Sequence, residues 1–100
     1  MTKEKLSISL AESALKDLQD ILAYYTEQKT PETGRRLVAE ILDDIQLLAD
    51  QPDMGRKVPE FDQDILRELI RPPFRIVYRR DPQQIRVVRV WRSERLLRLE

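Results

Sequence analysis

The sequence predicts an α+β domain spanning residues 1–100, in which a helical hairpin packs on one face of a small, mainly antiparallel sheet in the order β-α-α-β-β-β. A chain of 100 residues with 41% apolar side chains can bury one core and is too short for two. Two amphipathic segments come first along the chain, and three short apolar runs separated by turn residues come last. These observations favour one sheet covered by one pair of helices.

The first strand is expected at Leu6–Leu10, where Leu6, Ile8 and Leu10 alternate with serines as in a half-buried strand. Ser9 and Glu12 have the spacing of a capping box, so this strand is expected to run directly into a helix. The apolar residues of that helix recur every three or four positions, which is the spacing of a buried helix face. They are Ala11, Ala14, Leu15, Leu18, Ile21, Leu22 and Tyr25.

The second helix is expected after a break at Lys29, with Thr30 as its cap and Pro31 in its first position. Pro52 is expected to end it, because proline lacks the N–H group that a helix interior needs. Its apolar face consists of Leu37, Val38, Ile41, Leu42, Ile45, Leu48 and Ala49. Two such helices joined by a short turn predict an antiparallel hairpin.

Residues 51–64 are interpreted as a loop, because prolines and a glycine interrupt them and they show no regular period. Pro72-Pro73 then separates the first two of three apolar runs, and Asp81–Gln84 has the composition of a type I turn between the second and the third. The three runs predict an antiparallel meander with strands at Ile65–Ile70, Phe74–Arg80 and Ile85–Trp91.

Two absences in the composition exclude large classes of enzyme. Without cysteine, the chain has no disulfides, thiolate metal sites or thiol nucleophiles. Without histidine, it lacks the usual general base near neutral pH and the commonest metal ligand. We therefore expect no metal and no cofactor. The lack of a long apolar run or an export signal predicts a cytoplasmic protein that does not enter a membrane.

The net charge of zero conceals two halves of opposite charge. Residues 1–64 carry 8 basic and 14 acidic side chains, a balance of −6, whereas residues 65–100 carry 10 basic and 4 acidic ones, a balance of +6. All ten basic residues of the second half are arginines, and all five lysines lie in the first half. Arginine binds phosphates and carboxylates through a planar fork of donors, so this bias has a chemical meaning beyond charge.

The arginines of the second half are expected to line an open face of the sheet. On the middle strand Phe74, Ile76 and Tyr78 are expected to face the helices, which leaves Arg75 and Arg79 on the other face. The last strand alternates less regularly, so two assignments of its faces stay open, and either places an arginine on the open face. A basic concavity would be completed by Arg67 or Arg71 from the neighbouring strand and by Arg92, Arg95 and Arg98 from the tail.

Four acidic residues in the second half cannot pair with ten arginines, so we expect the partner to be the phosphates of RNA or DNA or an acidic protein. Trp91 can stack on a base, although a single tryptophan at a strand end more often lies at the edge of the core. Tyr24 and Tyr25 are interpreted as packing residues. The candidate target-binding residues are Arg67, Arg71, Arg79, Arg89, Trp91 and Arg92.

Glu60 is the only acidic residue in a loop near the basic half that attracts a catalytic interpretation. A carboxylate beside arginines can act as general base for a ribose 2′-hydroxyl, the first step of metal-free RNA cleavage. The alternative, which we prefer, is a loop residue that pairs with Arg56 or Lys57. The neighbouring Asp43 and Asp44 are interpreted as a solvent-exposed helix face rather than a metal site, because adjacent helical residues diverge by about 100°.

Several short motifs, in their joint order and spacing, resemble the RelE/ParE superfamily of toxins from type II toxin–antitoxin modules. The motifs cover nearly the whole chain: Ala14-x-x-Asp17-Leu18-x-x-Ile21, Leu48-x-x-x-Pro52-x-x-Gly55-Arg56, Arg67-x-Leu69, Phe74-Arg75-Ile76-Val77-Tyr78, and Val88-x-Val90 followed by Arg95. The resemblance implies a small bacterial or archaeal protein that arrests growth when free. It also implies a cognate antitoxin that wraps a flexible segment, part helix and part strand, around the toxin in a hetero-oligomer.

The resemblance implies two alternative mechanisms. RelE-like members are metal-independent, ribosome-dependent endoribonucleases that cleave mRNA, and in that pattern Arg75 and Arg95 match catalytic arginines. Two lysines expected on the preceding strand are replaced by Leu66 and Glu68, and the tyrosine expected after the second arginine would lie beyond residue 100. Glu60 loosely matches a loop glutamate that other nuclease members use. ParE-like members bind and poison DNA gyrase without acting as nucleases.

The missing lysines and tyrosine favour the ParE-like mechanism, with DNA gyrase as the target. One alternative is an mRNA interferase that acts on the ribosome and uses Arg75, Arg95 and Glu60 as catalytic residues. Another alternative, of a different class, is a non-toxic homologue that only binds the antitoxin. The sequence thus predicts a toxin-module protein and leaves its enzymatic status open.

Overall fold

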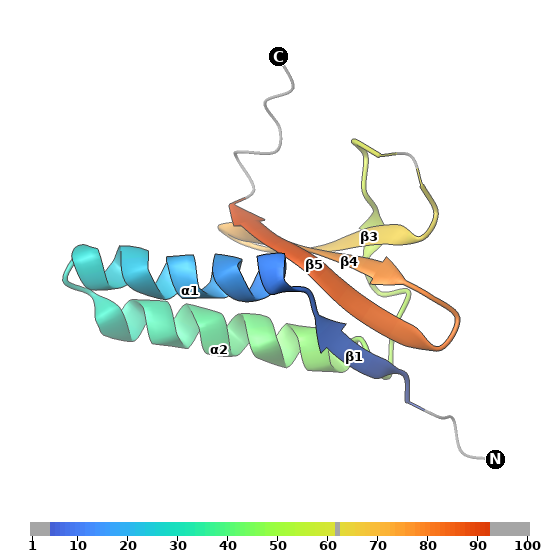
Figure 1. Ribbon diagram of the computed structural model, residues 1–100, viewed down its shortest axis with the longest axis horizontal. Helices are drawn as coiled ribbons and strands as arrows, with labels where there is room; N and C mark the ends of the chain where they lie inside the picture. Colours follow the sequence, from blue (N-terminus) through green and yellow to red (C-terminus); the bar gives the residue numbers. More distant parts are fainter. Residues whose placement is uncertain (1–4, 62, 93–100) are drawn as a thin grey trace.

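The computed structural model describes residues 5–61 and 63–92 of the chain. In these residues two helices and a five-stranded, mostly antiparallel sheet confirm the α+β class (Figure 1). The elements follow one another as β1 (Ser7–Leu10), α1 (Glu12–Glu27), α2 (Pro31–Leu47), β2 (Arg56–Lys57), β3 (Leu66–Arg71), β4 (Phe74–Arg80) and β5 (Gln84–Arg92). The short strand β2 lies in the segment that the sequence indicated to be a loop, and it pairs with β3.

The second helix begins at Pro31 as predicted, whereas the first begins at Glu12, later than a Ser9 cap would place it, and neither has the predicted side-chain cap. Ser9 lies in β1, Ala11 is the N-cap of α1, and no side-chain cap bond is present among the residues that the structure describes. The capping-box prediction is therefore wrong. Thr30 does precede Pro31 at the start of α2, but its hydroxyl donates to the carbonyl of Tyr25, 3.3 Å away, and thus closes the turn between the helices.

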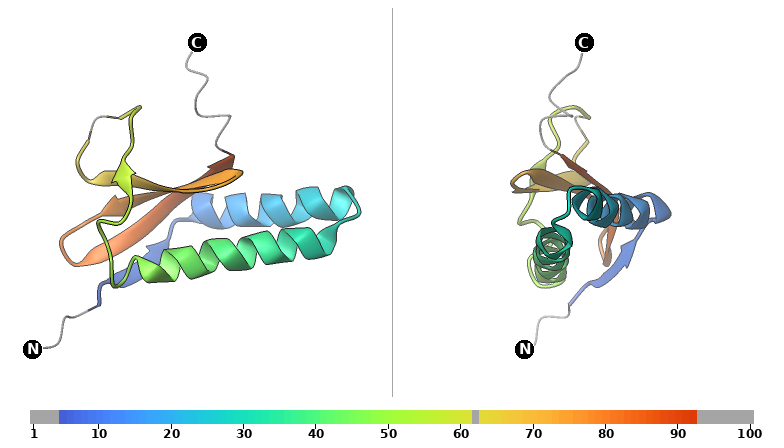
Figure 2. Two further views of the ribbon diagram at one scale, coloured as in Figure 1. Left: turned by 180° about the vertical axis from the view of Figure 1, so that it is seen from behind. Right: turned by 90° about the vertical axis from the view of Figure 1, so that its left-hand side faces the viewer.

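The sheet joins the two ends of the described chain. Its strand order is β1-β5-β4-β3-β2, with β1 parallel to β5 and the other neighbouring strands antiparallel. The two helices lie side by side against one face of this sheet, as Figure 1 and the opposite view in Figure 2 both show. The first strand therefore closes one edge of a meander built from the second half of the chain.

A β-bulge explains why the alternation of the last strand is irregular. Val77 pairs with Arg89 and Tyr78 pairs with Val87, which leaves Val88 as an extra residue in β5. Because an extra residue reverses the side to which all later residues point, buried positions change from odd to even numbers along the strand. Ile85 and Val87 are buried, and so is Val90. Each of the two face assignments left open by the sequence is correct for one part of β5.

The core lies between the helical hairpin and the sheet. It contains Ala14, Leu18, Ile21, Leu37, Ile41, Ile45, Leu48, Phe74, Ile76, Tyr78, Ile85, Val87 and Val90. The apolar residues of the predicted first strand, Leu6, Ile8 and Leu10, are partly buried and pack against this core. Phe74, Ile76 and Tyr78 face the helices as predicted. Neither helix of the described chain combines the length and apolar character needed to cross a membrane.

The other face of the sheet is not open along its whole width. The segment between α2 and β3 rises on the side away from the helices (Figures 1 and 2), and its Val58 is fully buried. Tyr78 anchors this segment: its hydroxyl donates to the carbonyl of Pro52 and accepts from the N–H of Gly55, both at 2.9 Å. A Cβ on Gly55 would come within 2.6 Å of the Glu68 carbonyl oxygen, so only glycine fits there.

Candidate functional site

The strand register places two candidate residues, Arg75 and Trp91, in one row on the face of the sheet away from the helices, which we call the outer face. Arg75 pairs with Ile70 on one side and with Trp91 on the other, and directly opposed residues in antiparallel strands point to the same face. Ile70 is 47% exposed, whereas Arg75 is only 2% exposed. The expectation that Arg75 lies on an open surface is therefore wrong.

Arg75 is buried because carboxylates surround its guanidinium. Its two terminal nitrogens donate to the two oxygens of Glu60, each at 3.0 Å, in a bidentate pair. One of these nitrogens also lies 2.6 Å from Oε1 of Glu68, whose side chain is fully buried on β3. Arg56 of β2 donates to the other oxygen of Glu68 at 2.5 Å. We call these four residues the Arg75 cluster.

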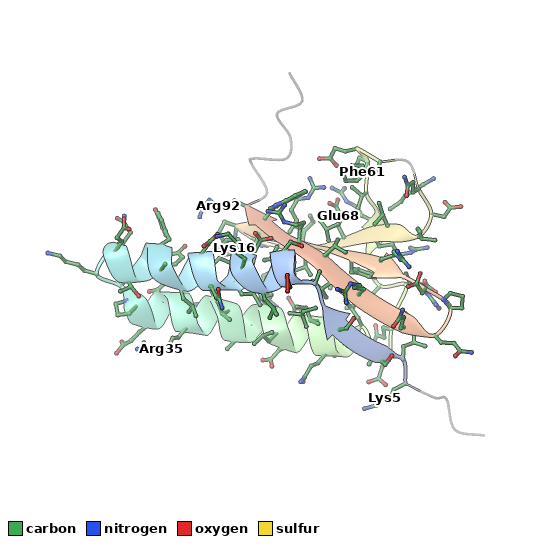
Figure 3. The ribbon with its side chains drawn as sticks, viewed as in Figure 1. Lys5, Lys16, Arg35, Phe61, Glu68 and Arg92 are labelled. Atoms are coloured by element: carbon green, nitrogen blue, oxygen red, sulfur yellow. The ribbon has the colours of Figure 1, made fainter. Side chains whose placement is uncertain are left out.

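The positions of Glu60 and Glu68 explain why Arg75 is not on the open surface that the sequence predicted. Glu60 comes from the segment between β2 and β3, and Glu68 lies on the outer face of β3, on the side away from the helices (Figure 3). Glu60 binds Arg75 rather than the predicted Arg56 or Lys57, and Lys57 instead lies 3.2 Å from Asp64. Residues 51–64, which the sequence indicated to be a loop, thus place the carboxylate of Glu60 over Arg75.

The charge state of Glu60 follows from this pairing. The hydrogen bond from Arg75 lowers the pKa of the Glu60 carboxyl below its usual 4.5, although burial opposes the shift. Glu60 is therefore ionised at neutral pH and is a weaker base than a free glutamate. This favours a structural ion pair over the general-base role that the nuclease alternative requires.

Arg71 of β3 pairs with α2 rather than with an external ligand. It lies on the helix-facing side of the sheet, where its guanidinium donates two hydrogen bonds to the carboxylate of Asp44. Glu40 lies 3.6 Å from the same guanidinium. The bond to Asp44 raises the pKa of Arg71. The expectation that Asp44 belongs to a purely solvent-exposed face is thus wrong.

Arg67 and Arg80 bind the segment after α2. Arg80 Nε donates to Asp53 at 2.9 Å, and Arg67 lies 3.7 Å from the same carboxylate. Arg67 also donates to the carbonyl of Gly55 at 3.0 Å. Both arginines therefore hold the segment that carries Gly55 toward the sheet.

Arg79 and Arg86 oppose each other on the outer face and are exposed. Arg79 pairs with Asp81 at 3.0 Å, and this bond lowers the pKa of the Asp81 carboxyl. Arg86 donates to the hydroxyl of Ser9 at 3.0 Å. Of the predicted target-binding residues, Arg79 is the one that matches the expected exposed position.

Arg89 joins β5 to the first helix. Its Nε and one terminal nitrogen donate to Asp17 of α1 at 2.8 and 3.0 Å, and the pKa of Arg89 is raised by this bond. The same carboxylate accepts the backbone N–H of Val90 at 2.8 Å, and Ser13 donates to the carbonyl of Val88. Since β1 pairs no further than Val87, the start of α1 replaces it as the partner of this strand edge.

The end of β5 carries the remaining candidates. The guanidinium of Arg89 lies 4.6 Å from the ring centroid of Trp91, and that of Arg92 lies 5.8 Å from the ring of Phe74. These are cation–π distances. A groove of about 410 Å³ separates α1 from this end of the sheet, and its lining includes Trp91, Arg92 and Tyr24. Trp91 and Arg92 therefore lie together, and Arg95 falls outside the described residues.

The family of the chain is decided by its match to a family model. The model of the ParE toxin of the type II toxin–antitoxin system, parDE, matches residues 8–97. The chain belongs to the ParE toxin family. The resemblance to the RelE/ParE superfamily is thereby confirmed, and with it the assignment as a toxin of a type II toxin–antitoxin system.

Solved structures show the same fold for this ParE-family chain. The chromosomal ParDE toxin–antitoxin system from P. aeruginosa matches with a TM-score of 0.73 and 24% identity, over 90% of this chain and 98% of that one. The toxin–antitoxin complex RelBE2 from Mycobacterium tuberculosis matches with a TM-score of 0.64 and 18% identity, over 88% and 98% of the two chains. A search of curated proteins gave no match.

Among the described residues of this ParE-family chain, acids pair with several arginines of the basic half, which counting charges along the sequence did not predict. The acids that bind its arginines come mostly from the first half of the sequence: Asp17, Asp44, Asp53 and Glu60. The expectation that too few acids are present to pair with the arginines counted only the second half, and it is wrong. Among the described residues no group of three acidic, cysteine or histidine side chains could hold a metal.

Two of the acids that pair with arginines could have been suspected from the sequence. Asp17 and Asp44 both lie on the polar sides of amphipathic helices, close to positions that pack on the sheet. Tyr25 packs against the core as predicted, whereas the adjacent Tyr24 is 50% exposed and meets Tyr25 edge to face. The contacts of Asp53 and Glu60 depend on the path of an irregular segment, for which no periodicity exists.

Proposed function

We propose that this ParE-family toxin acts by binding DNA gyrase, and that it is not an RNA-cleaving enzyme. The observation that carries the proposal is the burial of Arg75 between two carboxylates. A catalytic arginine must reach a scissile phosphate, and the guanidinium of this one is already paired with Glu60 and Glu68. Arg95, its proposed partner in the nuclease mechanism, lies outside the described residues.

A second feature supports binding over cleavage. The position where the nuclease pattern expects a lysine holds Glu68, and this side chain is part of the Arg75 cluster. A buried carboxylate in place of a cation lowers the positive potential that would stabilise a phosphorane-like transition state. The alternative role as a ribosome-dependent mRNA interferase with Arg75, Arg95 and Glu60 is therefore disfavoured.

We also propose a cognate antitoxin as the partner that silences this chain in the cytoplasm. Both similar structures are described as toxin–antitoxin systems or complexes, and they cover most of this chain. The groove beside Trp91 and the exposed Tyr24 supply apolar surface for such a partner. A homologue that only binds the antitoxin would share these features and would differ in lacking toxicity.

A gyrase supercoiling assay tests the proposed target. Adding the purified chain to gyrase, ATP and relaxed plasmid should trap cleaved DNA, and adding antitoxin beforehand should prevent it. The same chain added to translating ribosomes should give no new toeprints in the A site. Undisturbed gyrase at saturating toxin would overturn the gyrase proposal, and A-site cuts would reinstate the interferase. Normal colony formation after induction without antitoxin would indicate the non-toxic homologue.

A further inference from the structure

We propose that the guanidinium of Arg75 is a carboxylate-binding site that Glu60 closes in the free chain, and that an acidic side chain of the antitoxin replaces Glu60 in the complex. The identity of the partner rests on the proposed function. The site itself rests on the geometry of the Arg75 cluster, so the two parts can be tested separately.

The two acids that hold Arg75 differ in how firmly they are placed. Glu68 lies within a strand, its side chain is fully buried, and Arg56 binds its second oxygen. Glu60 lies between β2 and β3, outside any strand, and its side chain is 11% exposed. Of the two acids, Glu60 therefore lies nearer to solvent. A ligand would enter from the side of Glu60, while Glu68 keeps Arg75 in place.

The charge of the cluster specifies what can replace Glu60. Without Glu60, the cluster retains two guanidinium groups and one carboxylate, a balance of +1. One singly charged carboxylate restores neutrality and fits the two parallel donors of Arg75, as Glu60 does at 3.0 Å. A phosphodiester is also singly charged, but it is tetrahedral and carries two ester chains. It would have to bring both chains to a guanidinium that is 2% exposed.

The surroundings of the cluster favour a protein as the source of the carboxylate. Phe61 (labelled in Figure 3), next to Glu60 in the chain, is 45% exposed. Ile70 in the Arg75 row is 47% exposed. Trp91 flanks Arg75 on the other side of the same row. Exposed apolar side chains beside a buried charge offer contact area to a protein partner, while the charge sets specificity.

Chemical rescue with formate tests the site. Glu60→Ala should gain thermal stability on adding sodium formate, relative to sodium chloride of equal ionic strength, with half-saturation at roughly 10–100 mM as expected for one charge-assisted pair. The wild-type chain should show no formate-specific shift. Asp44→Ala is the matched control: it removes a carboxylate from a bidentate pair, but Arg71 is 38% exposed and retains Glu40, so formate should add nothing.

Each outcome of the formate experiment either supports or overturns the carboxylate site at Arg75. If Glu60→Ala does not fold alone, refolding with formate but not with chloride supports the site, and failure in both salts overturns it. A folded Glu60→Ala that responds equally to formate and chloride also overturns it. Stabilisation by inorganic phosphate as strong as that by formate would contradict the assignment to carboxylates.

Antitoxin binding then tests the exchange. The antitoxin encoded beside this chain should bind Glu60→Ala more tightly than wild type, because the internal competitor is gone, and excess formate should remove this gain. Equal affinities, unaffected by formate, would overturn the exchange. Failure of the antitoxin to bind either chain would refute the proposed function and hence the partner, while the formate titration would still decide the site.

Discussion

At the scale of single residues, the environment of Arg75 sets the strongest constraint. Buried ion pairs are costly to break from one side, because the remaining charge stays in a medium of low polarity. Arg75 is the residue that two buried or nearly buried carboxylates share. Arg75 is therefore expected to contribute to the stability of the fold, whatever it contributes to partner binding.

Arg75→Ala is expected to destabilise the chain by about 3–5 kcal/mol, since it leaves Glu68 and Glu60 without their shared counterion. Chemical denaturation followed by circular dichroism measures this directly. Arg79→Ala, on the same strand but with a half-exposed side chain, should change stability by no more than about 0.5 kcal/mol. A loss of toxicity in Arg75→Ala is interpretable only after this comparison.

Tyr78→Phe is expected to cost about 1–3 kcal/mol, because it leaves the buried N–H of Gly55 without its acceptor and the carbonyl of Pro52 without its donor. Tyr24→Phe provides the control, since Tyr24 is 50% exposed and the change should be near neutral. Denaturation midpoints of the two variants give the comparison. Equal, small effects would show that the Tyr78 hydroxyl does not anchor the segment after α2.

The pH dependence of stability should show the Glu60 pair. Because the folded-state pKa of Glu60 lies below its usual 4.5, the pair contributes its full stability above that pH and loses it as the pH falls through the folded-state pKa. Denaturation at a series of pH values from neutral to acid should therefore show a loss of stability that is smaller in Glu60→Gln. A Glu60→Gln variant with the same acid dependence as wild type would contradict the pairing.

At the scale of elements, the edge of β5 shows how a helix can complete a sheet. The strand extends to Arg92, but its parallel partner β1 ends at Leu10 opposite Val87. Beyond that point Asp17 and Ser13 of α1 bind backbone groups of β5. The bulge at Val88 lies at this change of partner, and the next residue, Arg89, binds Asp17.

Asp17→Ala should destabilise the chain by about 1.5–3 kcal/mol, as it removes charge-assisted bonds to Arg89 and to the N–H of Val90. Hydrogen exchange at the Val90 amide should become faster than at the amides of the β4–β5 ladder. Asp20→Ala, one turn later on the same helix, breaks only an exposed pair with Lys16 and should be nearly silent. A protected Val90 amide in Asp17→Ala would exclude this role.

The elements themselves were largely predictable, because period and turn composition are local. The apolar face of α1, the start of α2 at Pro31 and the three strands of the meander follow from spacing alone. The bulge at Val88 was visible in the sequence only as an irregular alternation of apolar and polar residues. The short strand β2 could not be predicted, since two polar residues are too few to show an alternation. Its pairing with β3 is determined by the path of the chain after α2.

At the scale of the whole molecule, the two oppositely charged halves of the sequence meet in the fold. Arginines of β3, β4 and β5 bind acids from α1, from α2 and from the segment after α2. Reading charge along the sequence revealed the two halves correctly. It could not reveal that they neutralise each other, because pairing between distant residues depends on the fold.

This internal neutralisation predicts weak binding to nucleic acid. The wild-type chain should bind duplex DNA no more tightly than about 10⁻⁴ M at physiological salt, the weak end of non-specific binding. Replacing Asp17, Asp44 and Asp53 with asparagine removes three carboxylates that pair with arginines, raises the net charge to about +3 and should tighten binding, with a steeper dependence on salt. Fluorescence anisotropy with a labelled duplex measures both. Tight, strongly salt-dependent binding by wild type would show that the arginines remain available.

The pairing of β1 with β5 also determines when a folded product can exist. Paired residues of β1 and β5 lie 77 residues apart in the sequence, so β1 has no partner strand until β5 has been synthesised. The helical hairpin can form from local contacts, but the core face that it presents stays uncovered until the meander follows. A nascent chain interrupted before β5 therefore lacks a complete sheet. A cell that makes this toxin is exposed to a finished molecule only once the ribosome has passed the codons for the last strand.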